Sequence, residues 1–155
     1  MDGAREINVT GYDDDCVAWA REQAGLLKAR NWGAVDWPNV IEEIEDLGKS
    51  ERRSLASALA RIMEHLIKLD YGTIRDPERG WQVTVETQRI DAERILEENP
   101  SLKRELPDLI AQEYPRARRL AMAGFTAHES DRLGEYERVV PTDCPYAVKA
   151  VLGEI

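Results

Sequence analysis

Residues 36–71 read DWPNVIEEIEDLGKSERRSLASALARIMEHLIKLDY, and the spacing of their apolar side chains decides the fold class. In the second half, large aliphatic residues recur at gaps of four and three, at Leu55, Leu59, Ile62, Leu66 and Leu69. That period places them on one face of an α-helix. The first half carries a similar stripe of Val40, Ile41, Ile44 and Leu47. We predict one long helix from Asp36 to Tyr71, which either continues through Gly48 or breaks there.

Two further segments on either side of this element also favour helix. A first helix is expected from Asp14 to Arg30, with Asp13 as its N-terminal cap. After the long element, residues 81–98 alternate like a strand at their start but also repeat at gaps of four and three. A lone strand has no partner here, so we predict helix. Val83 and Ile90 form a second stripe on the back of that helix. This stripe is either a second buried face or a self-association surface, and we favour burial within the monomer.

The C-terminal third predicts two more helices. Asn99-Pro100-Ser101 is a stop followed by a restart, with Ser101 as a cap for a helix from Leu102 to about Gly124. Residues 125–142 are expected to be loop. Asp143 then caps a short helix from Pro145 to Leu152.

These elements together predict an all-α fold, an antiparallel helical bundle of about five helices plus a short C-terminal helix. We expect residues 1–11 to be a flexible N-terminal arm and residues 12–155 to be a single helical-bundle domain. The chain is 155 residues long with 43% hydrophobic residues, enough to bury a sizeable core.

Charge and cysteine content exclude several classes of protein. The net charge is −9, so duplex nucleic acid is not expected as a partner, because that binding depends on Lys and Arg neutralising phosphates. No apolar run approaches the roughly 20 residues that span a bilayer, and no membrane association is expected. Cys16 and Cys144 form no metal-binding or disulfide pattern. We expect an acidic cytoplasmic protein, either a monomer or a weak homodimer.

Several segments, in the same order along the chain, resemble one known family. They are YDDDCVAWAREQAGLL (12–27), DWPNVIEEIEDLGKSERR (36–53), HLIKLDY (65–71), RGWQVTVETQR (79–89), NPSLKRELPDLIAQEYPRARRLA (99–121) and CPYAVKAVL (144–152). The chain resembles domain of unknown function family twenty-nine over about residues 12–152. This resemblance implies an all-helical fold and a bacterial source, and it implies no activity.

A few polar residues fall on or beside the apolar faces. Glu51 shares the face of the long helix with Leu55, and His65 flanks that face. In the later helix, Glu113 falls between apolar positions, and Arg89 is one of the candidate partners for a buried carboxylate. One interpretation is a polar pocket between helices, lined by Glu51, His65, Arg89 and Glu113. The other is a set of structural ion pairs that fix helix register, which we favour.

The remaining chemical patterns are incomplete. No Glu-x-x-His pair, zinc motif or glycine-rich phosphate loop is present, so no metal and no cofactor is expected. Glu42, Glu43, Glu45 and Asp46 only partly match the carboxylate pattern of helical nucleotide pyrophosphatases. Three hypotheses follow, in falling order: a non-enzymatic interaction or regulatory module with an unidentified protein partner, a small-ligand binder or enzyme using the polar pocket, and a metal-dependent nucleotide phosphohydrolase. No catalytic residue is assigned.

Overall fold

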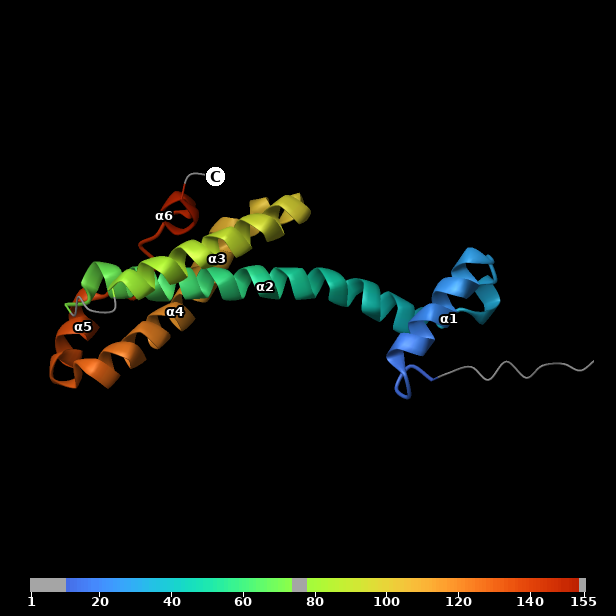
Figure 1. The fold of residues 1–155 in the computed structure, drawn as a ribbon, viewed down its shortest axis with the longest axis horizontal. Coiled ribbons are helices and arrows are strands. Elements are labelled where there is room, and N and C mark those ends of the chain that lie inside the picture. Colours follow the sequence, from blue (N-terminus) through green and yellow to red (C-terminus); the bar gives the residue numbers. More distant parts are fainter. Residues whose placement is uncertain (1–10, 74–77, 154–155) are drawn as a thin grey trace, which may run out of the picture. The chain divides into compact units, whose positions relative to one another are not determined.

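A computed structural model describes residues 11–73 and 78–153, and in these ranges it contains helices and no strand. This confirms the all-α fold (Figure 1). Contacts along the chain group into two compact units, Met1–Lys49 and Ser50–Ile155. The expected arm lies outside the described residues except for Gly11. The single domain expected over residues 12–155 stays a prediction, since grouping by contacts does not measure independent folding.

The first unit contains α1 (Cys16–Lys28), a short 3-10 helix (Trp32–Ala34) and the start of α2. The cap predicted at Asp13 is wrong. Asp15 holds that position, and its carboxylate accepts a hydrogen bond from the Ala18 amide at 2.9 Å because α1 begins only at Cys16. The core of this unit is a small apolar cluster of Trp19, Val35 and Val40, against which Tyr12, Leu26 and Leu27 pack.

Helix α2 runs from Trp37 to Tyr71 and passes through Gly48 without a break. The prediction of one long helix is therefore confirmed in its continuous form. Ile41, Ile44 and Leu47 are largely exposed, whereas Leu55, Leu59 and Ile62 are completely buried. The same apolar face is thus exposed at one end of the helix and buried at the other.

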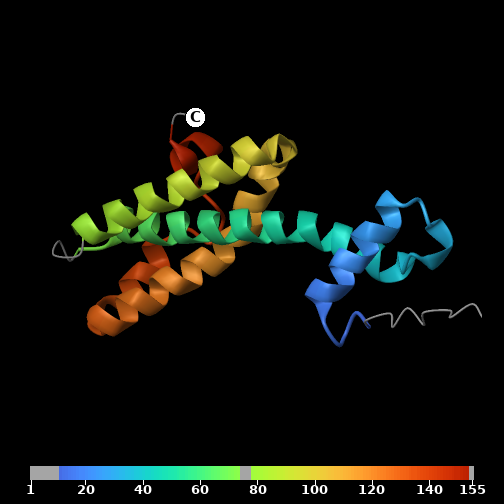
Figure 2. The same ribbon diagram turned by 45° about the vertical axis from the view of Figure 1, so that its right-hand side comes forward.

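The second unit is a bundle built on the part of α2 that begins at Ser50. Its other elements are α3 (Glu78–Glu98), a 3-10 helix (Pro100–Glu105), α4 (Leu106–His128), a second 3-10 helix (Ser130–Arg132), α5 (Leu133–Val139) and α6 (Val148–Leu152). Figures 1 and 2 agree that α3 and α4 lie alongside this part of α2, with α5 following the end of α4 and α6 beside α3. The core they enclose includes Leu59, Met63, Leu96, Leu109 and Tyr114.

Four expectations about this unit are wrong and one is confirmed. The short C-terminal helix expected from Pro145 with Asp143 as its cap begins only at Val148, with Ala147 at the N-cap position and no side-chain cap. Residues 125–142 are not loop, because α4 continues to His128 and α5 follows. Val83 and Ile90 are 65% and 59% exposed, so the back stripe of α3 is not buried. Ser101 lies within a 3-10 helix, and α4 begins only at Leu106. The ambiguous segment from Trp81 is helical throughout, as predicted.

Candidate functional site

The structure places the four residues predicted to line a pocket on three different helices. Glu51 and His65 lie on α2, Arg89 on α3 and Glu113 on α4. Glu113 lies 3.5 Å from Arg116 on the same helix. Glu51 and His65 are separated by fourteen positions, about 21 Å along a helix. No hydrogen bond or ion pair described for residues 11–73 and 78–153 joins two of these four, so a pocket formed by them stays a prediction.

Arg89 holds the C-terminal end of α6. Its Nε donates to the carbonyl of Val151 at 2.9 Å, and Nη2 donates to the carbonyl of Ala150 at 3.0 Å. The last carbonyls of a helix have no partner within it, and a cation there also interacts favourably with the helix dipole. Gly153 follows with φ of 80°, a conformation that glycine adopts without strain. Arg89 therefore fastens α6 to α3.

We expect Arg89→Met to lower the free energy of unfolding by about 1 kcal/mol, because two carbonyls at the C-terminal end of α6 lose their donor. Hydrogen exchange should accelerate at the amides of Val151 and Gly153, because these amides donate to the carbonyls of Ala147 and Lys149 in the turns of α6. Arg94→Met is the matched control, since Arg94 lies on the same helix, is 62% exposed and pairs with the exposed Glu98 at 3.6 Å. Unchanged exchange at Val151 in the Arg89 variant would contradict this role.

A charged cluster surrounds His65 on α2. Glu64 is buried, and its two carboxylate oxygens accept from Lys68 Nζ at 2.5 Å and from Arg61 Nη1 at 3.3 Å. Lys68 lies over Gly124 of α4, where a Cβ atom would come within 2.8 Å of its Cε. Because Gly124 has no side chain, the end of the Lys68 side chain can occupy this space. The Glu-to-Lys spacing of four residues was the sequence signal for this pair.

His65 itself is 7% exposed, and neither ring nitrogen has a hydrogen-bond partner among the described residues. Burial lowers the pKa of His65 below its ordinary value of 6.5. The Glu64 carboxylate raises it, and the charges of Lys68 and Arg61 lower it further. The imidazole is therefore neutral at neutral pH, beside the charged side chains of Glu64, Lys68 and Arg61.

The pKa shift of His65 predicts how stability depends on pH. Between the lowered folded pKa and the unfolded value near 6.5, the unfolded chain binds more protons at this side chain. Its contribution to the free energy of unfolding is therefore complete above pH 6.5 and is lost as the pH falls through that window. His65→Leu should remove this loss. It should also match or exceed the wild type at neutral pH, by up to about 1 kcal/mol, because no unpaired nitrogen is buried.

The measurement is urea unfolding of wild type and His65→Leu at about pH 7.5 and about pH 5.5. The matched control is His128→Leu at the exposed end of α4, because that variant retains the buried imidazole. An identical pH dependence in wild type and His65→Leu would contradict the prediction.

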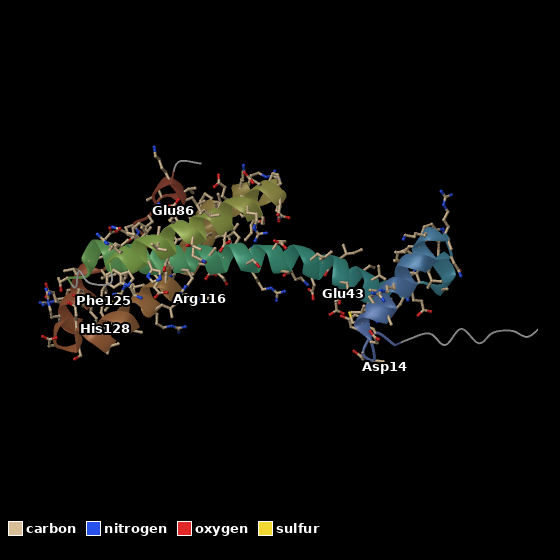
Figure 3. The ribbon with its side chains drawn as sticks, viewed as in Figure 1. Asp14, Glu43, Glu86, Arg116, Phe125 and His128 are labelled. Atoms are coloured by element: carbon tan, nitrogen blue, oxygen red, sulfur yellow. The ribbon has the colours of Figure 1, made fainter. Side chains whose placement is uncertain are left out.

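A second polar network lies where α4 meets α5, in the segment expected to be loop. The buried Glu129 accepts hydrogen bonds from Thr73 and from the Tyr136 hydroxyl, the latter at 2.6 Å. Arg132 Nη1 donates to Thr73 at 2.6 Å, and the Phe125 ring stacks on Tyr136 at 4.0 Å. Figure 3 labels Phe125 at this end of α4. The network joins the end of α2 to α5.

The Glu129 carboxyl is charged in this network. Burial raises its pKa, but the hydrogen bonds from Thr73 and Tyr136 outweigh burial and hold the pKa below its usual value. All the carboxylate contacts are internal, which is typical of a structural network. The sequence signal for this network is the spacing of Phe125, Glu129, Arg132 and Tyr136 at four, three and four, which is a helical period within the segment expected to be loop.

The first unit presents a different feature, an exposed apolar face on α2. We call Trp37, Ile41, Ile44 and Leu47 the α2 apolar stripe. Their exposed fractions are 43%, 52%, 64% and 70%, and their gaps of four, three and three place them along one side of the helix. Trp32 packs against the start of the stripe, with its ring stacked on Trp37 at 6.3 Å and its carbonyl accepting from the Trp37 indole at 3.0 Å.

Carboxylates share this part of α2 with the apolar stripe, and the helical period places Glu43 and Glu45 beside the stripe and Glu42 and Asp46 on the opposite side. Glu45 and Asp46 lie 3.6 Å and 3.0 Å from Lys49, and all three side chains are about half exposed or more. Glu43 accepts a hydrogen bond from the Tyr12 hydroxyl at 2.5 Å, which raises the pKa of Tyr12 to about 12 (Glu43 is labelled in Figure 3). The partial match to a pyrophosphatase motif is therefore a solvated acidic face.

Metal-ion sites and membrane-spanning helices are two further features that the described residues can be compared with. Within residues 11–73 and 78–153, no three or more His, Cys, Asp and Glu side chains are grouped so as to hold a metal ion. In the same part of the chain, no helix is both long and apolar enough to cross a membrane.

The chain is an all-α protein with a buried Glu64–Lys68 ion pair in its bundle and exposed apolar side chains on α2 and on α3. The chain belongs to the family described as Domain of unknown function DUF29, whose model matches residues 11–154. No curated protein and no solved structure matches the chain. The description of this family names no activity.

Proposed function

We propose that the protein is a non-enzymatic interaction module that binds a helix of another protein through the α2 apolar stripe. The exposure of Trp37, Ile41, Ile44 and Leu47 carries this proposal. Scattered exposed leucines are ordinary, but a run on one helix side is typical of helix-in-groove recognition, where anchors recur at three and four residues. Each such side chain contributes about 1.5–3 kcal/mol when it is fully buried.

The aromatic end of the stripe supports a binding role. Tryptophan is enriched among the residues that dominate binding energy. The Trp37 side chain is already oriented by its stacking on Trp32 and by its hydrogen bond to the Trp32 carbonyl. A side chain that is ordered before binding loses less entropy when a partner covers it.

A cytoplasmic, bacterial setting completes the proposal. Cys16 and Cys144 are both free thiols, which fits a reducing compartment. The resemblance of the sequence to a bacterial family supports the source. The monomeric or weakly dimeric state expected from the sequence leaves the stripe available to a different protein.

Site-specific photocrosslinking in the native cells tests the proposed function. A photoreactive residue in place of Ile44 should give a discrete adduct with another protein, and the same probe in place of Ile90 on α3 should not. Ile90 is the matched position, because it is a similarly exposed isoleucine on a helix. The purified partner should then bind the chain, and Ile41→Gln with Leu47→Gln should weaken that binding by about tenfold or more.

Two outcomes would overturn the interaction module. One is the same set of adducts from positions 44 and 90, which would indicate contact without a specific surface. The other is a purified partner whose binding is unaffected by the Ile41→Gln and Leu47→Gln changes.

A further inference from the structure

We infer that the partner segment is a positively charged amphipathic helix, an inference that rests on the proposed function of the α2 apolar stripe. Residues 36–49 contain five carboxylates, Asp36, Glu42, Glu43, Glu45 and Asp46, and one cation, Lys49, which pairs with Glu45 and Asp46. Across residues 11–49 there are nine acidic and four basic residues, a net charge of −5. The first unit is therefore acidic overall, and Glu43 and Glu45 are the two carboxylates that fall beside the stripe.

The carboxylates lie where a partner's charges would meet them. Glu45 follows Ile41 by four residues, and Glu43 precedes Leu47 by four, so one carboxylate borders each long edge of the stripe. Opposite charges at the rim of an apolar interface raise the association rate and select against wrong partners. A helix with Leu or Ile on one side and Lys or Arg on both flanks matches this pattern.

The same charges disfavour two other occupants. A second copy of the chain would bring identical acidic edges against each other around the stripe, and like charges in register are unfavourable. An anionic lipid surface would be repelled for the same reason. The length of the stripe also fits a helix, since its eleven residues, from Trp37 to Leu47, span about 16 Å.

The experiment uses the full-length chain and three labelled synthetic peptides of about 18 residues, about five helical turns. One has leucines on a single helix side and lysines elsewhere. The second has the same leucines with glutamates, and the third has the composition of the first with its leucines distributed around the helix. Fluorescence anisotropy should give the lysine peptide a Kd at least about tenfold lower than either of the others.

Variants of the chain locate the binding and separate its two components. Ile41→Gln with Leu47→Gln should weaken binding of the lysine peptide by about tenfold, and Val83→Gln with Ile90→Gln on α3 should leave it within about twofold. Glu43→Gln with Glu45→Gln should weaken it several-fold and reduce its dependence on salt. The matched control is Glu93→Gln with Glu97→Gln, at exposed positions of α3.

The outcomes distinguish this inference from the proposed function. Equal binding of the lysine and glutamate peptides, both lost in the Ile41/Leu47 variant, would overturn the basic partner and retain the binding face. Undiminished binding of the lysine peptide to that variant would overturn both. The inference also fails if the lysine peptide shows no binding at peptide concentrations up to about 1 mM. It fails as well if sedimentation finds self-association of the chain that the Ile41/Leu47 variant abolishes. In both cases, crosslinking at position 44 decides the proposed function.

Discussion

Leu59→Ala is expected to lower the free energy of unfolding by about 3 kcal/mol, because it removes a completely buried side chain and leaves a cavity in the bundle. Leu47→Ala, the same substitution twelve residues earlier on the same helix, is expected to cost less than about 0.5 kcal/mol. Leu47 is mostly in water in the folded chain, so its truncation removes few contacts. Both leucines belong to the apolar pattern that predicts α2.

Urea unfolding followed by far-ultraviolet circular dichroism measures the contrast. The midpoint should shift strongly for Leu59→Ala and hardly for Leu47→Ala, with similar slopes against urea. Comparable losses at the two positions would mean that Leu47 is covered in solution, and the α2 apolar stripe would then not be a free binding face. The experiment therefore tests the premise of the proposed function without knowledge of the partner.

Lys68→Met is expected to lower the free energy of unfolding by about 2–3 kcal/mol. The change removes the ammonium group that lies 2.5 Å from Glu64. Among the described residues it leaves a carboxylate that is 7% exposed with Arg61 as its remaining ionic partner. Breaking one side of a buried ion pair is costly because the remaining charge stays out of water. Arg61 still pairs with Glu64 in this variant. The expected loss in the free energy of unfolding is therefore smaller than for a buried carboxylate left with no cation beside it.

The double variant Glu64→Leu with Lys68→Met separates the ion pair from the packing of its side chains. It should recover most of the loss of Lys68→Met, since no charge is left buried and the volume of both side chains is retained. A coupling free energy of at least about 1.5 kcal/mol is expected from the double-mutant cycle. Additive losses would contradict a direct interaction. Arg116→Met, at an exposed ion pair with Glu113, is the control and should cost little.

Two of the four polar residues chosen from the sequence make contacts of a structural kind. Arg89 fastens α6, and Glu113 pairs with a neighbour one turn away. Helical periodicity predicts which side of a helix a residue occupies, and it carries no information about which other helix lies opposite. Glu51, His65, Arg89 and Glu113 could thus be assigned to helix faces but not to a common pocket.

Glu129, Tyr136 and Thr73 illustrate what the sequence reasoning missed. Their network depends on α4 continuing to His128 and turning into α5, in a segment whose glycine and charged residues favoured loop. The Phe125 and Tyr136 rings stack there across the turn, and burial of those rings stabilises helices that the local sequence only weakly favours. Tertiary packing overrode local preference.

The sequence by itself determined the helical character of this protein. The apolar period at three and four residues is a local property, and it was sufficient to predict α2 and the ambiguous segment of α3, whereas the sequence left open whether the helix continues through Gly48. Only the tertiary structure decided which parts of each apolar face are covered. Ile44 and Ile62 carry the same side chain on the same side of α2, yet one is exposed and the other buried. Burial depends on neighbouring helices that the periodicity does not contain, and the α2 apolar stripe exists because α3 and α4 pack on the later residues of that face.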